Sequence, residues 1–175
     1  MTEQDKILEA LKIAIEMEND GKECYQQASQ ESGNEVGRKL LQSLALEEDT
    51  HRQKFVEIYQ AMQEKKGWPV TNFKPDKGKK LKALFTGTCE LIGVNVKAVA
   101  TEFDAINTAI DKEKKSYDFY EHQSQNATYD AERDFYEALA AEEREHELIL
   151  VDYYEYLTDP AGWFTRTEHH SLDGG

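Results

Sequence analysis

The sequence contains two copies of one helical hairpin, and the copies are offset by 95 residues. Apolar positions coincide under this shift, and several polar positions coincide with them without a gap. The shared pattern predicts two hairpins of the same shape, and therefore a bundle with approximate internal twofold symmetry. The polar pairs that coincide include Glu18 with Glu113, Tyr25 with Tyr120, Glu47 with Glu142, Glu48 with Glu143 and His51 with His146.

Four long segments repeat apolar residues every three to four positions, which is the period of an amphipathic helix. They span about residues 2–32, 35–66, 98–126 and 129–157. Short turns join the helices within each pair, whereas a stretch of low periodicity, about 67–98, separates the pairs. Within that stretch, residues 80–85 are expected to form a short helix. This layout predicts an all-α fold, a four-helix bundle over residues 1–158 with one long crossover between helices two and three.

Composition narrows the class of protein. The 175-residue chain carries a net charge of −14, which argues against a general nucleic-acid binder and against an anionic membrane surface. No stretch approaches the 18 apolar residues of a membrane span, and the first twenty residues lack the pattern of a secretory signal. The two cysteines, Cys24 and Cys89, form no C-x-x-C motif, so we expect a reducing, cytoplasmic setting.

Each helix carries a glutamate in the middle of its apolar stripe, and two helices add a histidine three residues later. Burying one ionised carboxylate costs several kcal/mol, and a group of four would also repel one another. Two divalent cations would neutralise four carboxylates and two neutral imidazoles. Residues at i and i+3 lie on one helix face, so each Glu-x-x-His pair can reach one metal.

This set fits the donor pattern of two-metal carboxylate bundles, in which two helices give one Glu each and two give Glu-x-x-His. Oxygen and imidazole donors without thiolate suit iron or manganese, and zinc also fits. The alternative is an acidic helical protein whose glutamates face solvent. The predicted ligands are Glu18, Glu48, His51, Glu113, Glu143 and His146.

Smaller signals surround these positions. Tyr25 and Tyr120 follow Glu18 and Glu113 by two helical turns, where a phenol can hydrogen-bond a ligand carboxylate or simply fill the core. Gly21 and Ser116 follow the same glutamates by one turn and either leave room at the metals or allow close helix packing. Cys24 coincides with Phe119 in the repeat, which favours a packed apolar role over a redox thiol.

Two further segments have open interpretations. The lysines 74, 77, 79, 80 and 82 form a basic cluster that either docks an acidic electron-transfer protein or is a solvated loop. The tail, 159–175, carries Trp163 and Phe164, which we expect to pack on the bundle or on a partner subunit. Its Glu168, His169 and His170 offer donors for a third metal site, and its role is otherwise open.

The segments AIEMENDGKECYQQAS and AIDKEKKSYDFYEHQS resemble the first and third helices of rubrerythrin-type ferritin-like proteins. LALEEDTH and LAAEEREH resemble their Glu-x-x-His helices, and the resemblance covers about residues 5–157. It implies a ferritin-like bundle with a non-haem di-iron site at the same six residues. It also implies that the reduced site reacts with hydrogen peroxide or oxygen, with Glu48 and Glu143 as bridging ligands and both histidines as terminal ligands.

The chain departs from that family at two points. It lacks the four cysteines of a rubredoxin-like iron domain, so electrons would come from an external donor protein such as a rubredoxin. The family's extra glutamate, three residues after the third-helix ligand, is replaced here by Ser116. A mechanism in which an iron moves onto that carboxylate is therefore not supported. We expect a homodimer.

Three functions remain in view at this point. The first is a di-iron oxidoreductase that reduces hydrogen peroxide or oxygen. The second is a ferroxidase that takes up many irons. The third is a metal-poor helical interaction module.

Overall fold

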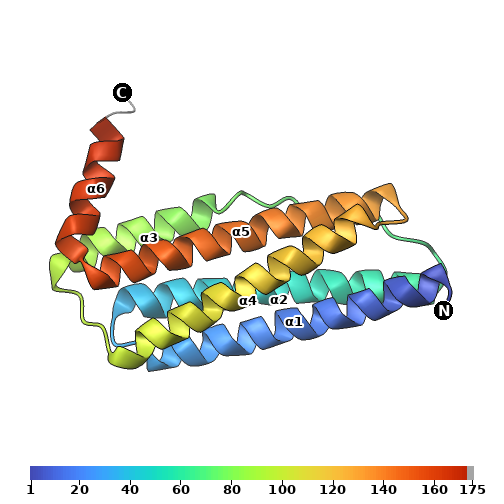
Figure 1. Cartoon of the computed structure of the whole chain (residues 1–175), viewed down its shortest axis with the longest axis horizontal. Helices are drawn as coiled ribbons and strands as arrows, with labels where there is room; N and C mark the ends of the chain where they lie inside the picture. Colours follow the sequence, from blue (N-terminus) through green and yellow to red (C-terminus); the bar gives the residue numbers. More distant parts are fainter. Residues whose placement is uncertain (173–175) are drawn as a thin grey trace.

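The computed structural model describes the backbone of residues 1–172 and the side chains of residues 1–168. Within this part every regular element is helical, which confirms the predicted all-α class (Figure 1). The elements are α1 (Glu3–Glu31), α2 (Glu35–Gln63), α3 (Lys79–Ile92), the 3-10 helix η1 (Gly93–Asn95), α4 (Ala100–Gln125), α5 (Asp130–Thr158) and α6 (Pro160–Leu172).

The four long helices form the predicted bundle. Helices α1 and α2 make one antiparallel hairpin, α4 and α5 make the other, and the hairpins meet where α1 packs on α4 and α2 on α5. After α2, the chain runs back along the bundle through α3, so α4 starts at the end where α2 starts (Figure 1). The two hairpins therefore run in opposite directions, and equivalent residues near their centres meet at one level.

The core has two apolar halves with a polar layer between them. One half lies where α1 turns into α2 and includes Leu40, Leu44 and Leu150. The other lies at the opposite end and includes Leu11, Phe55 and Leu139. The apolar halves supply the burial that holds the helices together, at about 25 cal/mol per Å² of apolar surface. They leave the middle of the bundle to polar groups.

A buried hydrogen-bond network fastens the turn between α1 and α2. The carboxylate of Glu102, at the start of α4, accepts hydrogen bonds from Gly33 N, Ser32 Oγ (3.3 Å) and Asn34 Nδ2 (3.1 Å). The hydroxyl of Tyr153 also donates to it, at 3.2 Å. The network joins both hairpins at this end, so it fixes their relative position.

Gly37 lies against this network, and its replacement by alanine is expected to destabilise the fold. A Cβ atom there would collide with the hydroxyl oxygens of Ser32 and Tyr153. We expect Gly37→Ala to lower the free energy of unfolding by about 1–3 kcal/mol. Gly87, in α3, is the matched control, because a Cβ there meets nothing within 4 Å. Gly87→Ala should stabilise the helix by about 0.5–1 kcal/mol. Urea unfolding distinguishes the two, and equal effects would contradict this account.

The crossover is more ordered than the sequence indicated. Helix α3 spans 79–92 rather than the predicted 80–85, because Leu81, Phe85 and Cys89 line one face that packs on the core. Gly78 and Gly93, both with positive φ, bound the helix. Burial raises the pKa of the Cys89 thiol to about 12, so it remains an inert packed side chain.

The tail forms helix α6, whose far part projects from the end of the bundle (Figure 1). Trp163 is buried, its Nε1 donates to Asp152 at 2.6 Å, and its ring contacts Phe85 and Tyr156. Phe164 also contacts Tyr156. Glu168 is exposed. The side chains of His169 and His170 lie outside the described residues, so the third metal site remains a prediction of the sequence.

Candidate metal centre

The six predicted ligands converge in the polar layer at the middle of the bundle. Each is at most 3% exposed, although none is apolar. Helix α1 contributes Glu18 and α4 contributes Glu113, while α2 and α5 contribute one Glu-x-x-His pair each. The apolar residues that precede and follow these groups on each helix bury them, as their spacing in the sequence predicted.

The six residues form two overlapping groups that share Glu48 and Glu143. Glu18 and His51 complete one group, and Glu113 and His146 complete the other. In each group one donor atom per residue lies within 4.8 Å of all the others. The 95-residue offset converts one group into the other. This geometry offers two adjoining groups that can each hold a cation, with two carboxylates in common, and the shared pair is the one expected to bridge.

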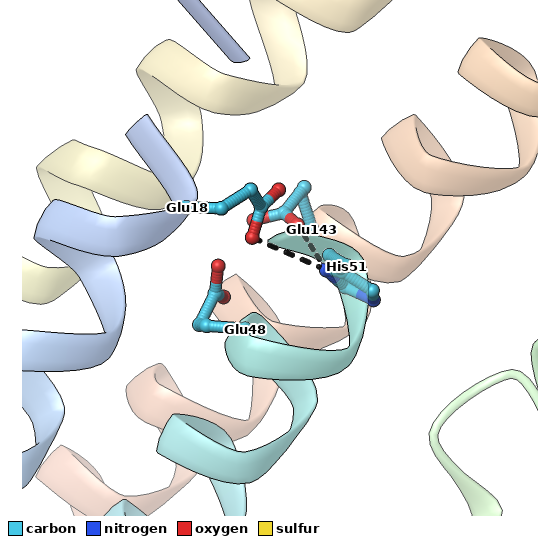
Figure 2. A group of neighbouring side chains, drawn as sticks. All are labelled: Glu18, Glu48, His51 and Glu143. Carbon is cyan, nitrogen blue, oxygen red and sulfur yellow. Dashed lines mark ion pairs between the residues drawn. The ribbon is translucent and has the colours of Figure 1, made fainter. Parts of the chain in front are cut away.

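The Nδ1 atom of each histidine faces the carboxylates of both hairpins. His51 Nδ1 lies 3.4 Å from Glu18 Oε2 and 3.2 Å from Glu143 Oε1 (Figure 2). His146 Nδ1 lies 3.4 Å from Glu113 Oε1 and 3.1 Å from Glu48 Oε1. The two rings stack, with centroids 5.9 Å apart. Each imidazole thus points its Nδ1 atom at one carboxylate from each hairpin.

Several donor atoms in this layer make no hydrogen bond within the described part of the chain. They are Glu18 Oε2, His51 Nδ1, Glu113 Oε2 and Glu143 Oε1. A buried polar atom without a partner costs about 1–3 kcal/mol, and a charged one costs more. Divalent cations would satisfy all of them at once. The residues present therefore fit a pair of divalent metal ions held by oxygen and imidazole nitrogen.

Electrostatics distinguish the shared carboxylates from the other two. Burial, followed by repulsion from neighbouring carboxylates, raises the pKa of Glu48 and Glu143 well above the ordinary value. Burial also acts on Glu113, but the charge of His146 and hydrogen bonds outweigh it and hold its pKa at about 2. The pKa of Glu18 is lowered in the same way, against burial, by His51. Without metal, burial and repulsion therefore favour the protonated form at the shared pair more than at Glu18 and Glu113.

Tyr25 and Tyr120 hydrogen-bond across the two hairpins. Tyr25 donates to Glu113 Oε1, and Tyr120 donates to Glu18 Oε1. Burial, and then the adjacent carboxylates, raise the pKa of both phenols well above 10, so they remain donors. Each tyrosine therefore orients the unshared glutamate of the opposite hairpin.

Glu47 and Glu142 belong to the centre, although sequence reasoning assigned them no role. His146 Nε2 lies 2.5 Å from Glu47 Oε2 and 3.9 Å from Glu142 Oε2. Glu142 is buried, and Glu47 is partly exposed. A carboxylate on the outer nitrogen of a ligand histidine fixes the ring and its tautomer. The repeat had already paired these two residues, and that pairing was the signal that could have identified them.

Removal of the Glu47 carboxylate is expected to weaken metal binding without abolishing it. Glu47→Gln replaces the charged acceptor that orients His146 by a neutral amide, and losses of this kind typically cost about 10–100-fold in metal affinity. Anaerobic titration with a competing chelator measures the change. Glu57→Gln, an exposed position on α2, is the control and should bind like the wild type. An unchanged affinity in Glu47→Gln would show that His146 needs no such support.

A cavity of about 230 Å³ reaches the centre between α1 and α4. It touches the shared carboxylates Glu48 and Glu143, together with Glu113. Gly21 and Ser116 line it from the two helices. A Cβ at position 21 would come within 3.3 Å of Glu48 Oε2, so glycine keeps this approach open. Cys24 also lines the cavity and is half-buried rather than fully packed.

In a comparison with known families, the Rubrerythrin family model matches residues 9–154. No curated protein and no solved structure matches the chain. Among the described helices, none is long and apolar enough to cross a membrane. The family match covers both hairpins and all six residues of the buried carboxylate and histidine cluster, which is compatible with a di-iron site. The chain belongs to the rubrerythrin family.

Proposed function

We propose that the protein is a non-haem di-iron oxidoreductase that reduces hydrogen peroxide with electrons from an external donor protein. The observation that carries the proposal is the pair of overlapping donor groups with Glu48 and Glu143 in common. Glu18, Glu113 and the two histidines complete the two positions. Two iron ions held there would supply the redox chemistry, and manganese or zinc fits the same donors.

The reaction balances with two electrons. One hydrogen peroxide molecule takes up two electrons and two protons and gives two water molecules, while two one-electron donor molecules are oxidised. The cavity between α1 and α4 is wide enough for a small oxidant and leads to the shared carboxylates. Tyr25 keeps Glu113 oriented at this cavity. The apolar halves of the core exclude bulk water from the two ends of the bundle.

Rapid mixing of the ferrous protein with peroxide or oxygen tests the proposal. The protein is loaded anaerobically with two equivalents of ferrous iron and mixed with either oxidant. We expect oxidation by peroxide to be at least about 10-fold faster than oxidation by oxygen, with catalytic peroxide consumption when a rubredoxin supplies electrons. Faster reaction with oxygen, together with uptake of many irons per chain, would instead support iron oxidation and storage.

The homodimer, the cytoplasmic setting and the division into residues 1–158 and 159–175 stay predictions from the sequence. Sedimentation of the purified chain measures the first of these directly.

A further inference from the structure

The crossover carries a group of exposed lysines that contribute little to the stability of the fold. Lysines 74, 77, 79, 80 and 82 are exposed on a chain of net charge −14. Of these five, in the described residues, only Lys82 forms an ion pair, with Glu145 at 3.2 Å. Three of them occupy the first turn of α3, where a positive charge opposes the helix dipole. Only Asp76 offsets this, by accepting from the backbone N–H groups of Gly78 and Lys80.

An apolar patch lies beside the lysines on the same segment. Val70 is 89% exposed, and Phe73 is partly exposed. Both line a hollow of about 150 Å³ together with the buried Phe135 and the exposed Asp134. An apolar centre with charged residues near its edge is the usual composition of a small protein–protein interface. We call Val70, Phe73 and the five lysines the crossover surface.

This surface lies directly over the histidine side of the centre. The ring of Phe73 meets the ring of His51 edge-on, with centroids 5.6 Å apart. Gly78 packs on Glu145, the residue before His146. A single layer of crossover residues thus separates a protein docked here from the imidazole of His51. In Figure 1 the segment that leads into α3, and α3 itself, lie along α5, on the side of the bundle away from α1.

The small-molecule cavity opens elsewhere, between α1 and α4. Its lining includes no crossover residue. In the four-helix arrangement, the α1–α4 side is opposite the α2–α5 side that carries the histidines. An oxidant and a protein bound to the crossover surface can therefore occupy the molecule together.

We propose that the crossover surface is the docking site for a small acidic one-electron carrier protein. The inference rests on the proposed function, because that reaction needs two electrons from outside the chain. The lysines attract an acidic partner over a Debye length of about 8 Å at physiological salt, and the apolar patch supports the contact. Two carrier molecules dock in turn, and each gives up one electron.

Charge reversal at the surface tests the docking site. The probe is an acidic rubredoxin, and its binding to the full chain, with and without metal, is measured by calorimetry at low and high salt. We expect Lys79→Glu with Lys80→Glu to weaken binding at least 10-fold. The matched control reverses Lys39 and Lys97, which are exposed and lie outside the crossover surface. The control carries the same net charge as the double variant and should bind within about 2-fold of the wild type.

Folding and function can be separated in this experiment. Glutamate at the start of α3 favours the helix dipole, so the melting temperature of the Lys79→Glu, Lys80→Glu variant should not fall. The docking site would be overturned if that variant bound as tightly as the wild type, or if the control lost as much affinity as the variant. It would also be overturned if the wild type did not bind. Binding is measured without turnover, so the docking result does not depend on whether the protein reduces peroxide.

Discussion

Replacing Glu48 and Glu143 together by glutamine is expected to reduce the metal content from about two ions per chain to none. Both side chains belong to both donor groups, so each metal position loses two negatively charged ligands. Peroxide consumption should fall by more than about 100-fold, because even the loss of a supporting carboxylate costs about 10–100-fold. Elemental analysis and a peroxide assay measure the two effects.

The same variant should be at least as stable as the wild type when both are free of metal. Glutamine keeps the shape of the side chain and is neutral at every pH, whereas each of these buried carboxyls must hold a proton to avoid repulsion from its neighbours. Glu57→Gln with Glu137→Gln, exposed on α2 and α5, is the matched control and should keep the metals and the activity. Two ions still bound in the Glu48→Gln, Glu143→Gln protein would contradict the assignment of these residues.

Metal removal is expected to lower the melting temperature and to reverse the pH dependence of stability. A ligand at 1,000 times its dissociation constant stabilises a fold by about 4 kcal/mol. For a chain of this size that corresponds to about 8–16 °C for one site. Chelation followed by a thermal scan measures the loss. An unchanged melting temperature would favour the interaction-module alternative.

The sign of the pH effect follows from the pKa shifts. The pKa values of Glu48 and Glu143 are raised, and so are those of His51 and His146, where the carboxylates outweigh burial. Without metal, the folded chain therefore keeps protons that the unfolded chain releases, from the ordinary values of 4.5 and 6.5 upward. Its stability should fall as pH rises, by about 1.4 kcal/mol per pH unit for each proton.

The metal-loaded protein should show the opposite trend. Metals bind the deprotonated ligands, so their affinity and the stability they add increase with pH. Lowered pKa values at Glu18 and Glu113 act only at acidic pH, below 4.5. Urea unfolding between about pH 5.5 and 8, with and without metal, measures both trends. If stability changed with pH in the same way with and without metal, protons and metal would not compete for the carboxylates and histidines.

The sequence predicted the bundle and the residues at its centre because both depend on periodicity. Seam spacing placed Glu18 and His51 in an apolar stripe, and the 95-residue offset identified their counterparts. The same periodicity explains why these residues are buried and converge in the structure. Spacing left Tyr25 and Tyr120 either to hydrogen-bond a ligand carboxylate or to fill the core, and only the three-dimensional arrangement shows their hydrogen bonds between the hairpins.

Features without a period were not predictable in this way. Glu47 lies one position outside the stripe, so its contact with His146 depends on how α2 is rotated against α5. Phe73 reaches His51 from an irregular segment. The sequence predicts that the fourth helix ends near residue 157, shortly before Pro160, and α5 ends at Thr158. Proline also suits the first turn of a helix, and Asp159 accepts from Gly162 N, so α6 begins at the same point.

Metal content per chain, measured by elemental analysis on protein purified without oxygen and then titrated with ferrous iron, tests the central claim most directly. The paired donor groups around Glu48 and Glu143 require about two ions per chain, bound tightly enough to survive gel filtration. A chain that holds no metal and takes up none on addition of ferrous iron would contradict the account, because the buried carboxylates would then not form a metal site.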